Sequence, residues 1–451
     1  MLPTISTGNV SSALAGEYEV ANSLRFDKGS SDHLTRTPSS AGNRKTWTWS
    51  GWVKRATSDA SNNMVLWSSY EDANNRFSLQ LSNTDQFQSY ALEGGSLTAR
   101  ILSEAKLFDR SAWYHFVYAF DTTQSTATDR QKLYINGVQV DIVSSSRVDP
   151  SQDAELAIND TQEHEIGAQN SANPLDGYLA EVVFIDGLAL DPTSFGEFDS
   201  DSPNIWKPID VSGLTFGTNG FYLDFENASS LGADVSGNSN NFTLNNLTSV
   251  DQSTDTCTNN FATMNSIAVP PSNAPTFAEG NTKVSTNSSN ANPVISTIGV
   301  SKGKWYAEAK RISFDSGSDD DGFRIGFGVT YDDNVNLIPA GIADSGHYFM
   351  IGTGTVYNGS TDLGDKAGDS NISDNGVVGI ALDLDNNRIS WAFNGAWMTG
   401  SNAWSGSSPS SYVTIESGKT YFFLQTDGST GRGYTAGWNF GGSSAFTISS
   451  G

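Results

Sequence analysis

Short segments in which apolar and polar residues alternate recur along the chain, separated by residues that favour turns. In Phe77–Leu81 every second residue is apolar, which is the period of a strand with one buried face. Trp113–Phe120 is apolar on both faces and predicts a central strand covered on both sides. Lys132–Val140 and Ile389–Trp397 each contain Asn-Gly, the strongest short hairpin signal, because both central residues of a type I′ turn need positive φ. The pattern therefore predicts an all-β chain.

Length and composition set the number of domains and the classes of partner. A chain of 451 residues is too long for one core, and about 150 residues per domain gives two or three domains.

The chain has 25 Lys and Arg against 50 Asp and Glu, a net charge of -25. Binding to nucleic acid needs a basic face, so we expect no nucleic-acid partner. The acidic residues are spread along the chain, which favours a solvated surface over a dedicated acidic site. Cys257 is the only cysteine, so an intrachain disulfide is excluded.

The first residues carry no export or membrane signal. Met1–Gly8 has neither a basic region nor an apolar core, and no later stretch is long enough to span a bilayer. We therefore expect synthesis in the cytoplasm without a signal peptide, and no membrane insertion. Residues 1–22 are polar without a clear period, so we expect an N-terminal docking arm that gains structure from a partner or from packing on the first domain.

Four segments of the first half of the chain resemble a known family. Three indoles lie within Trp47–Trp52, followed by the strand Trp113–Phe120, the first Asn-Gly hairpin, and the ending Leu175–Asp186. In this order they resemble laminin-G-like, concanavalin A-like jelly rolls. The resemblance implies a β-sandwich over residues 23–205.

The last third of the chain resembles a different family. Gly303–Glu308, Val377–Asp385 and Trp438–Gly441 occur in the order seen in SPRY domains, which are also concanavalin-like sandwiches. The resemblance implies a second β-sandwich over residues 301–451. Residues 206–300 are richer in turn formers and predict a loop-rich connector with some strands. We thus expect two concanavalin-like/jelly-roll β-sandwich domains joined by this connector.

The amino-acid sequence of the connector resembles a further group of proteins. Asp234–Gln252 and Asp255–Thr263 are similar to the connector in virion proteins of tailed phages, particularly marine ones, although Cys257 stands where a proline is expected. This resemblance implies a tail-fibre, head-fibre or decoration-type appendage that is made in the host cytoplasm and located on the virion. The N-terminal arm would then bind other virion proteins, and we expect a homo-oligomer on the particle.

Two roles on the particle stay open at this point. In the first, the two sandwiches attach the particle to a glycan or protein of the host surface. In the second, the chain is purely structural and decorates or bridges the particle by gripping neighbouring virion proteins.

An enzymatic role is a third and weaker alternative. Glycosidases with this fold need two carboxylates, usually within Glu-x-Asp-x-x-Glu. The nearest approach is Glu197-Phe-Asp199, with Ser202 in place of the second Glu, so we expect no enzymatic activity. The histidines do not lie at zinc-ligand spacing, and we expect His115 to be buried in its strand. A Ser-His-Asp arrangement stays open, because triads assemble in space.

Four residues are candidates for binding. Laminin-G-type jelly rolls often hold calcium at a rim, and Asp176 is the candidate ligand for such a structural calcium ion; a solvated acidic loop is the alternative. Tyr357, Trp397 and Trp404 lie in or beside polar loops, where an exposed ring could stack on a sugar. For these rings the alternative is a place in the core.

Overall fold

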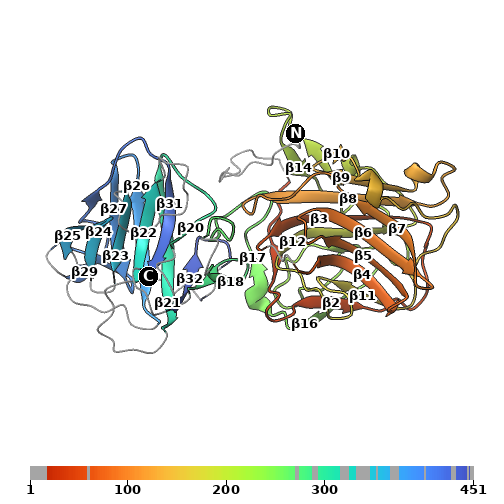
Figure 1. Cartoon of the computed structure of the whole chain (residues 1–451), viewed down its shortest axis with the longest axis horizontal. Coiled ribbons are helices and arrows are strands. Elements are labelled where there is room, and N and C mark those ends of the chain that lie inside the picture. Colours follow the sequence, from red (N-terminus) through yellow and green to blue (C-terminus); the bar gives the residue numbers. More distant parts are fainter. Residues whose placement is uncertain are drawn as a thin grey trace. The chain divides into compact units, whose positions relative to one another are not determined.

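The computed structural model describes residues 18–57, 61–269, 274–286, 293–314, 325–331, 346–351, 354–365, 375–400, 403–427, 433–443 and 446. The chain divides into two compact units, Met1–Asn260 and Phe261–Gly451. Figure 1 colours the first from red to green and the second from green to blue. None of the helices among these residues is long and apolar enough to cross a membrane.

Two antiparallel sheets form the first unit (Figure 1). The eight-stranded sheet has the order β10 (Val138–Gln139), β9 (Gln131–Ile135), β8 (Trp113–Asp121), β3 (Thr46–Arg55), β12 (Gly177–Asp186), β1 (Ser23–Phe26) and β17 (Gln252–Ser253), and β15 (Phe221–Leu223) also pairs with β12. The seven-stranded sheet has the order β16 (Thr243–Asn245), β2 (His33–Arg36), β11 (Glu163–Ile166), β4 (Met64–Asp72), β5 (Asn75–Leu81), β6 (Phe87–Glu93) and β7 (Ser96–Leu102).

Short elements complete this unit. They are the strand pair β13 (Gly196–Phe198) and β14 (Trp206–Pro208), and the 3-10 helices η1 (Ala127–Asp129), η2 (Ser144–Ser146), η3 (Pro192–Ser194) and η4 (Ser249–Asp251).

The core of the first unit lies between its two sheets. Trp47 of β3 meets Trp67 of β4 edge-on, with ring centroids 5.7 Å apart, and stacks on Phe120 of β8 at 4.8 Å. All three side chains are almost fully buried. Such aromatic contacts add to the burial of apolar area, so the indole-rich segment holds the sandwich together.

The second unit is also a sandwich of two antiparallel sheets. The nine-stranded sheet has the order β18 (Thr276–Ala278), β19 (Lys283–Ser285), β32 (Tyr434–Asn439), β21 (Lys304–Phe314), β26 (Val377–Asp383), β27 (Arg388–Phe393), β28 (Ala396–Met398) and β29 (Trp404–Gly406), and β30 (Val413–Thr414) also pairs with β27. The six-stranded sheet has the order β20 (Val294–Ile295), β31 (Tyr421–Asp427), β22 (Ile325–Tyr331), β23 (His347–Ile351), β24 (Thr355–Asn358) and β25 (Thr361–Asp365). The prediction of an all-β chain with two sandwiches is confirmed.

Both Asn-Gly hairpins form as predicted. Asn136 and Gly137 join β9 to β10 with φ of 48° and 79°, and Asn394 and Gly395 join β27 to β28 with φ of 47° and 82°. These are the positive values that a type I′ turn requires. A Cβ on Gly137 would lie 2.3 Å from Cε3 of Trp206, so contact as well as conformation demands glycine there.

The expected connector over 206–300 is not a separate segment in the structure. β15, β16 and β17 join the sheets of the first unit, and β18, β19 and β20 join those of the second. Asp255 fixes the end of the first part, since its carboxylate accepts hydrogen bonds from Lys54 Nζ at 2.6 Å and Trp113 Nε1 at 3.1 Å. These partners lie far away in sequence, and turn-rich composition gives no sign of them.

The expected N-terminal docking arm lies mostly outside the described residues, which begin at Tyr18. Tyr18 donates a hydrogen bond to Glu181 Oε2 at 2.8 Å, and Val20 is buried with its N–H donating to Thr258 Oγ1 at 3.0 Å. Residues 18–22 therefore pack on the first sandwich.

Candidate functional site

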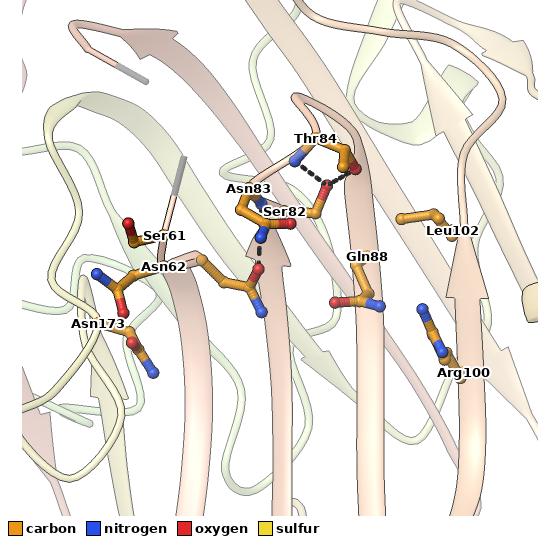
Figure 2. A pocket seen from close by; sticks show the side chains of 10 residues that line it. Ser61, Asn62, Ser82, Asn83, Thr84, Gln88, Arg100, Leu102 and Asn173 are labelled. Atoms are coloured by element: carbon orange, nitrogen blue, oxygen red, sulfur yellow. Dashed lines mark hydrogen bonds between the residues drawn. The ribbon is translucent and has the colours of Figure 1, made fainter. Parts of the chain in front are cut away.

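A polar pocket of about 500 Å³ lies at one end of the seven-stranded sheet of the first unit (Figure 2). Most of its lining side chains are amides or hydroxyls. The amide and hydroxyl residues are Ser61, Asn62, Asn63, Ser82, Asn83, Thr84, Gln88 and Asn173. Arg100 and Leu102 complete the lining.

Strand alternation places the polar residues on the outer face of this sheet. Leu79 and Leu81 of β5 point into the core, so Gln80 between them points outward. The strand register then sets Gln80 opposite Gln88 of β6, and Gln88 opposite Leu102 of β7. Arg100 lies two residues before Leu102 and shares its face. The β5–β6–β7 meander thus brings the pocket floor together.

At the floor of the pocket the Gln88 amide of β6 lies between Gln80 of β5 and Arg100 of β7. With the Gln88 amide oxygen turned toward β7, it accepts hydrogen bonds from Arg100 Nε at 2.9 Å and Nη2 at 3.1 Å. In this orientation the Gln88 nitrogen lies 2.7 Å from Gln80 Nε2, and the hydrogen bond from Gln80 Nε2 to the Gln88 oxygen belongs to the opposite orientation of the amide. Both glutamines are 6% exposed. Buried partners of this kind hold the Arg100 guanidinium in one orientation.

The turn between β5 and β6 forms the mouth of the pocket and is fixed by its own hydrogen bonds. Ser82 Oγ accepts from the N–H groups of Thr84 at 3.3 Å and Gln86 at 3.2 Å. Asn83 N–H donates to Asn63 Oδ1 at 3.1 Å, which ties the turn to the segment before β4 (Figure 2). The mouth is therefore preorganised, and this lowers the entropic cost of holding a ligand.

Two buried arginines hold the same turn in place through ion pairs with Asp85. Asp85 accepts from Arg55 Nη1 at 2.8 Å and from Arg110 Nη2 at 3.0 Å. Burial would raise the pKa of Asp85, but the hydrogen bond from Arg110 and the charge of Arg55 outweigh it and hold the pKa below its usual value. Asp85 is thus charged at neutral pH and keeps the turn in place.

Asp176, the expected calcium ligand, is buried away from this pocket's lining. Its Oδ2 accepts from the Thr57 hydroxyl, its Oδ1 has no hydrogen-bond partner, and burial raises its pKa to about 6. Across the described ranges, no group of three or more His, Cys, Asp or Glu side chains is arranged to hold a metal. A calcium ion is coordinated by six to eight oxygen ligands. The surroundings of Asp176 supply no acidic cluster for one.

The three expected aromatic ligand residues lie in different environments in the second unit. Tyr357 on β24 stacks on Phe349 of the adjacent strand β23, with ring centroids 5.7 Å apart. Trp404 on β29 pairs with the buried Met398 and packs against the core. Trp397 on β28 contacts Tyr306, which is 50% exposed. Trp397 and Trp404 thus lie on adjacent strands of the nine-stranded sheet and Tyr357 lies in the six-stranded sheet, and Trp404 packs against the core.

His115 is buried in its strand, as expected, and it is not arranged as a catalytic base. Trp206 Nε1 donates to His115 Nδ1 at 2.9 Å, so the ring proton lies on Nε2 and points to Ser50 Oγ, also at 2.9 Å. Burial lowers the pKa of His115 to about 3. A ring that donates to Ser50 cannot accept its proton, so this pair is not a nucleophile and base.

Sequence reasoning missed the pocket. Gln80 and Gln88 are the polar positions of two alternating strands joined by a short turn, and this signal could have paired them. Asn62 and Asn173 reach the pocket from distant loops, for which the sequence gives no such signal.

The family comparison covers the part of the chain that holds this pocket. Residues 28–193 match the Laminin_G_3 model, described as the concanavalin A-like lectin/glucanases superfamily. The first unit holds a concanavalin A-like domain. All ten residues that line the pocket fall within the matched range of this domain. A search of curated protein sequences finds no match.

Several solved structures match parts of this chain. The SPRY domain of human HERC1 has 11% identity and a TM-score of 0.30, with 40% of this chain and 98% of that one covered. A SAP-like pentraxin from Limulus polyphemus has 16% identity and a TM-score of 0.29, with 38% and 79% covered. A putative carbohydrate binding protein from Bacteroides ovatus has 13% identity and a TM-score of 0.34, with 51% and 59% covered.

Proposed function

We propose that the concanavalin A-like domain binds carbohydrate in the pocket between β5, β6, β7 and the loops at their end. The observation that carries this proposal is the lining: eight of its ten side chains are amides or hydroxyls. These groups both donate and accept, as sugar hydroxyls do. The family model that matches the domain describes lectins and glucanases.

The proposed function is binding of the sugar without its cleavage. Glycoside hydrolysis needs two carboxyl groups that flank the scissile bond. None of the ten residues that line the pocket is an aspartate or glutamate. We therefore assign the pocket to recognition and not to an enzyme.

For the biological setting, we propose a virion appendage of a tailed phage, which uses the pocket to attach to a host-surface glycan. The resemblance of Asp234–Thr263 to the connector of such virion proteins supports this setting. A structural role in decorating or bridging the particle is the alternative. The two differ in an adsorption assay, because particles that lack the chain but still adsorb normally would favour the structural role.

Glycan binding by the purified full chain tests the proposed function. The wild type should bind glycans on an array, and Asn62→Ala/Asn83→Ala should weaken that binding about tenfold or more, because each lost hydrogen bond contributes about 0.5–1.5 kcal/mol. Asn74→Ala is the matched control, since Asn74 is exposed in the turn between β4 and β5, away from the pocket. Equal binding by all three proteins would refute the assignment of the pocket.

A further inference from the structure

Arg100 is the charged residue of the pocket and pairs with no carboxylate among the described residues. Some other arginines of the same unit form ion pairs, since Arg25 contacts Asp251 at 2.9 Å and Arg147 contacts Asp149 at 2.8 Å, whereas Arg36 donates to the neutral amide of Asn240. The Arg100 side chain instead meets the neutral amide of Gln88. Its positive charge is therefore not neutralised within the pocket.

Arg100 lines the pocket, and its contacts with Gln88 use only part of the guanidinium. Arginine has five N–H donors, and the Gln88 oxygen accepts from Nε and Nη2. The backbone of Arg100 is fixed as well, since its N–H and C=O both bond Val148 at 2.8 Å. Figure 2 shows Arg100 beside Gln88 on the pocket floor. The remaining donors, chiefly those on Nη1, are left for a ligand.

The surroundings favour an anion at this position. The lining contains Arg100 and no carboxylate, in a chain whose net charge is -25. An anionic polymer has no general attraction to such a protein, so its binding must come from a local positive group. A planar guanidinium held by hydrogen bonds suits the oxygen pairs of a carboxylate or a sulfate ester.

We propose that the pocket selects an anionic glycan and that Arg100 pairs with its carboxylate or sulfate group. This inference rests on the proposed carbohydrate binding and adds the chemical class of the sugar. The neighbouring amides and hydroxyls bind the sugar hydroxyls, and Arg100 distinguishes charged from neutral sugars.

Two matched pairs of polysaccharides test the inference and separate the two anions. Polygalacturonate is compared with its methyl ester, and dextran sulfate with dextran, by titration calorimetry on the full chain. We expect one anionic probe to bind at least about tenfold more tightly than its neutral partner, and Arg100→Gln to abolish that preference. Arg100→Lys should keep part of it, because the charge remains and the paired donors are lost.

The control variant is Lys132→Gln, which removes one positive charge from β9 in the other sheet and should leave binding unchanged. Melting temperatures of all variants confirm folding. If the neutral probes bind as well as the anionic ones and Arg100→Gln has no effect, the anionic assignment is wrong while carbohydrate binding stands. If the folded wild type binds none of the four probes, both the anionic assignment and its basis in carbohydrate binding are contradicted.

Discussion

Removal of the Asp255 carboxylate should destabilise the first unit more than any change on its surface. Lys54 is fully buried, and its Nζ contacts Asp255 Oδ2 at 2.6 Å and Asn260 Oδ1 at 2.8 Å. In Asp255→Ala the ammonium loses its carboxylate partner but keeps the Asn260 amide, and Trp113 Nε1 loses its acceptor. Breaking a buried ion pair in this way costs about 3–5 kcal/mol.

Calorimetry of the full chain measures this cost as a shift of the melting transition of the first unit. Each kcal/mol lowers the melting temperature of a unit of this size by about 2–4 °C, so we expect a fall of about 6–20 °C. The exposed pair between Asp129 and Lys132 provides the control, and Asp129→Ala should cost less than about 1 kcal/mol.

A second variant isolates the charge. Lys54→Met/Asp255→Leu removes both members of the pair and should recover most of the stability, because no unpaired charge is left in the core. A loss below about 1 kcal/mol in Asp255→Ala would refute the reasoning, since it would mean that Lys54 is hydrated or uncharged at no cost.

Three further predictions concern pH, backbone conformation and metal. Burial raises the pKa of Glu181 to about 7, so the protonated form stabilises the fold below pH 4.5 and this stability is lost as the pH rises through 7. Glu181→Gln should remove about 3 kcal/mol of this pH dependence, and urea midpoints that vary with pH in the same way for both proteins would contradict it. In denaturant titrations, Gly137→Ala should lower the free energy of unfolding more than Gly395→Ala does. Both glycines have positive φ, but only a Cβ at position 137 would meet a side chain, that of Trp206. EDTA should leave the melting temperature of the first unit unchanged, because Asp176 has no acidic cluster around it; a fall that calcium reverses would show otherwise.

The fold was predictable where the signal is local. Alternation in Phe77–Leu81 and the Asn-Gly pairs depends on the pleat and on φ, which neighbouring residues determine. The end of the first unit was not predictable, because Asp255 is held by Lys54, about two hundred residues earlier. The composition of the segment around Asp255 is typical of a loop. Turn-rich composition does not distinguish a free connector from one fastened to a sandwich.

The sequence did not indicate where the proposed sugar-binding pocket lies. A sugar-binding surface was expected at exposed aromatics, but Trp404 packs against Met398 and the core, and Tyr357 stacks on Phe349. Aromatic residues in loops of a sandwich are easily buried, since their apolar area favours the core. The pocket is made of amides instead, and common polar residues such as Asn62 and Asn83 carry no signal until the fold brings them together.

A crystal structure of the full chain with a bound oligosaccharide would test the central claim most directly. The account predicts the sugar in the pocket of the concanavalin A-like domain, with its hydroxyls on the amides of the Asn62 and Asn83 loops and its acidic group on Arg100. A sugar bound instead against Trp397 and Tyr306 of the second unit, with the pocket empty, would contradict it.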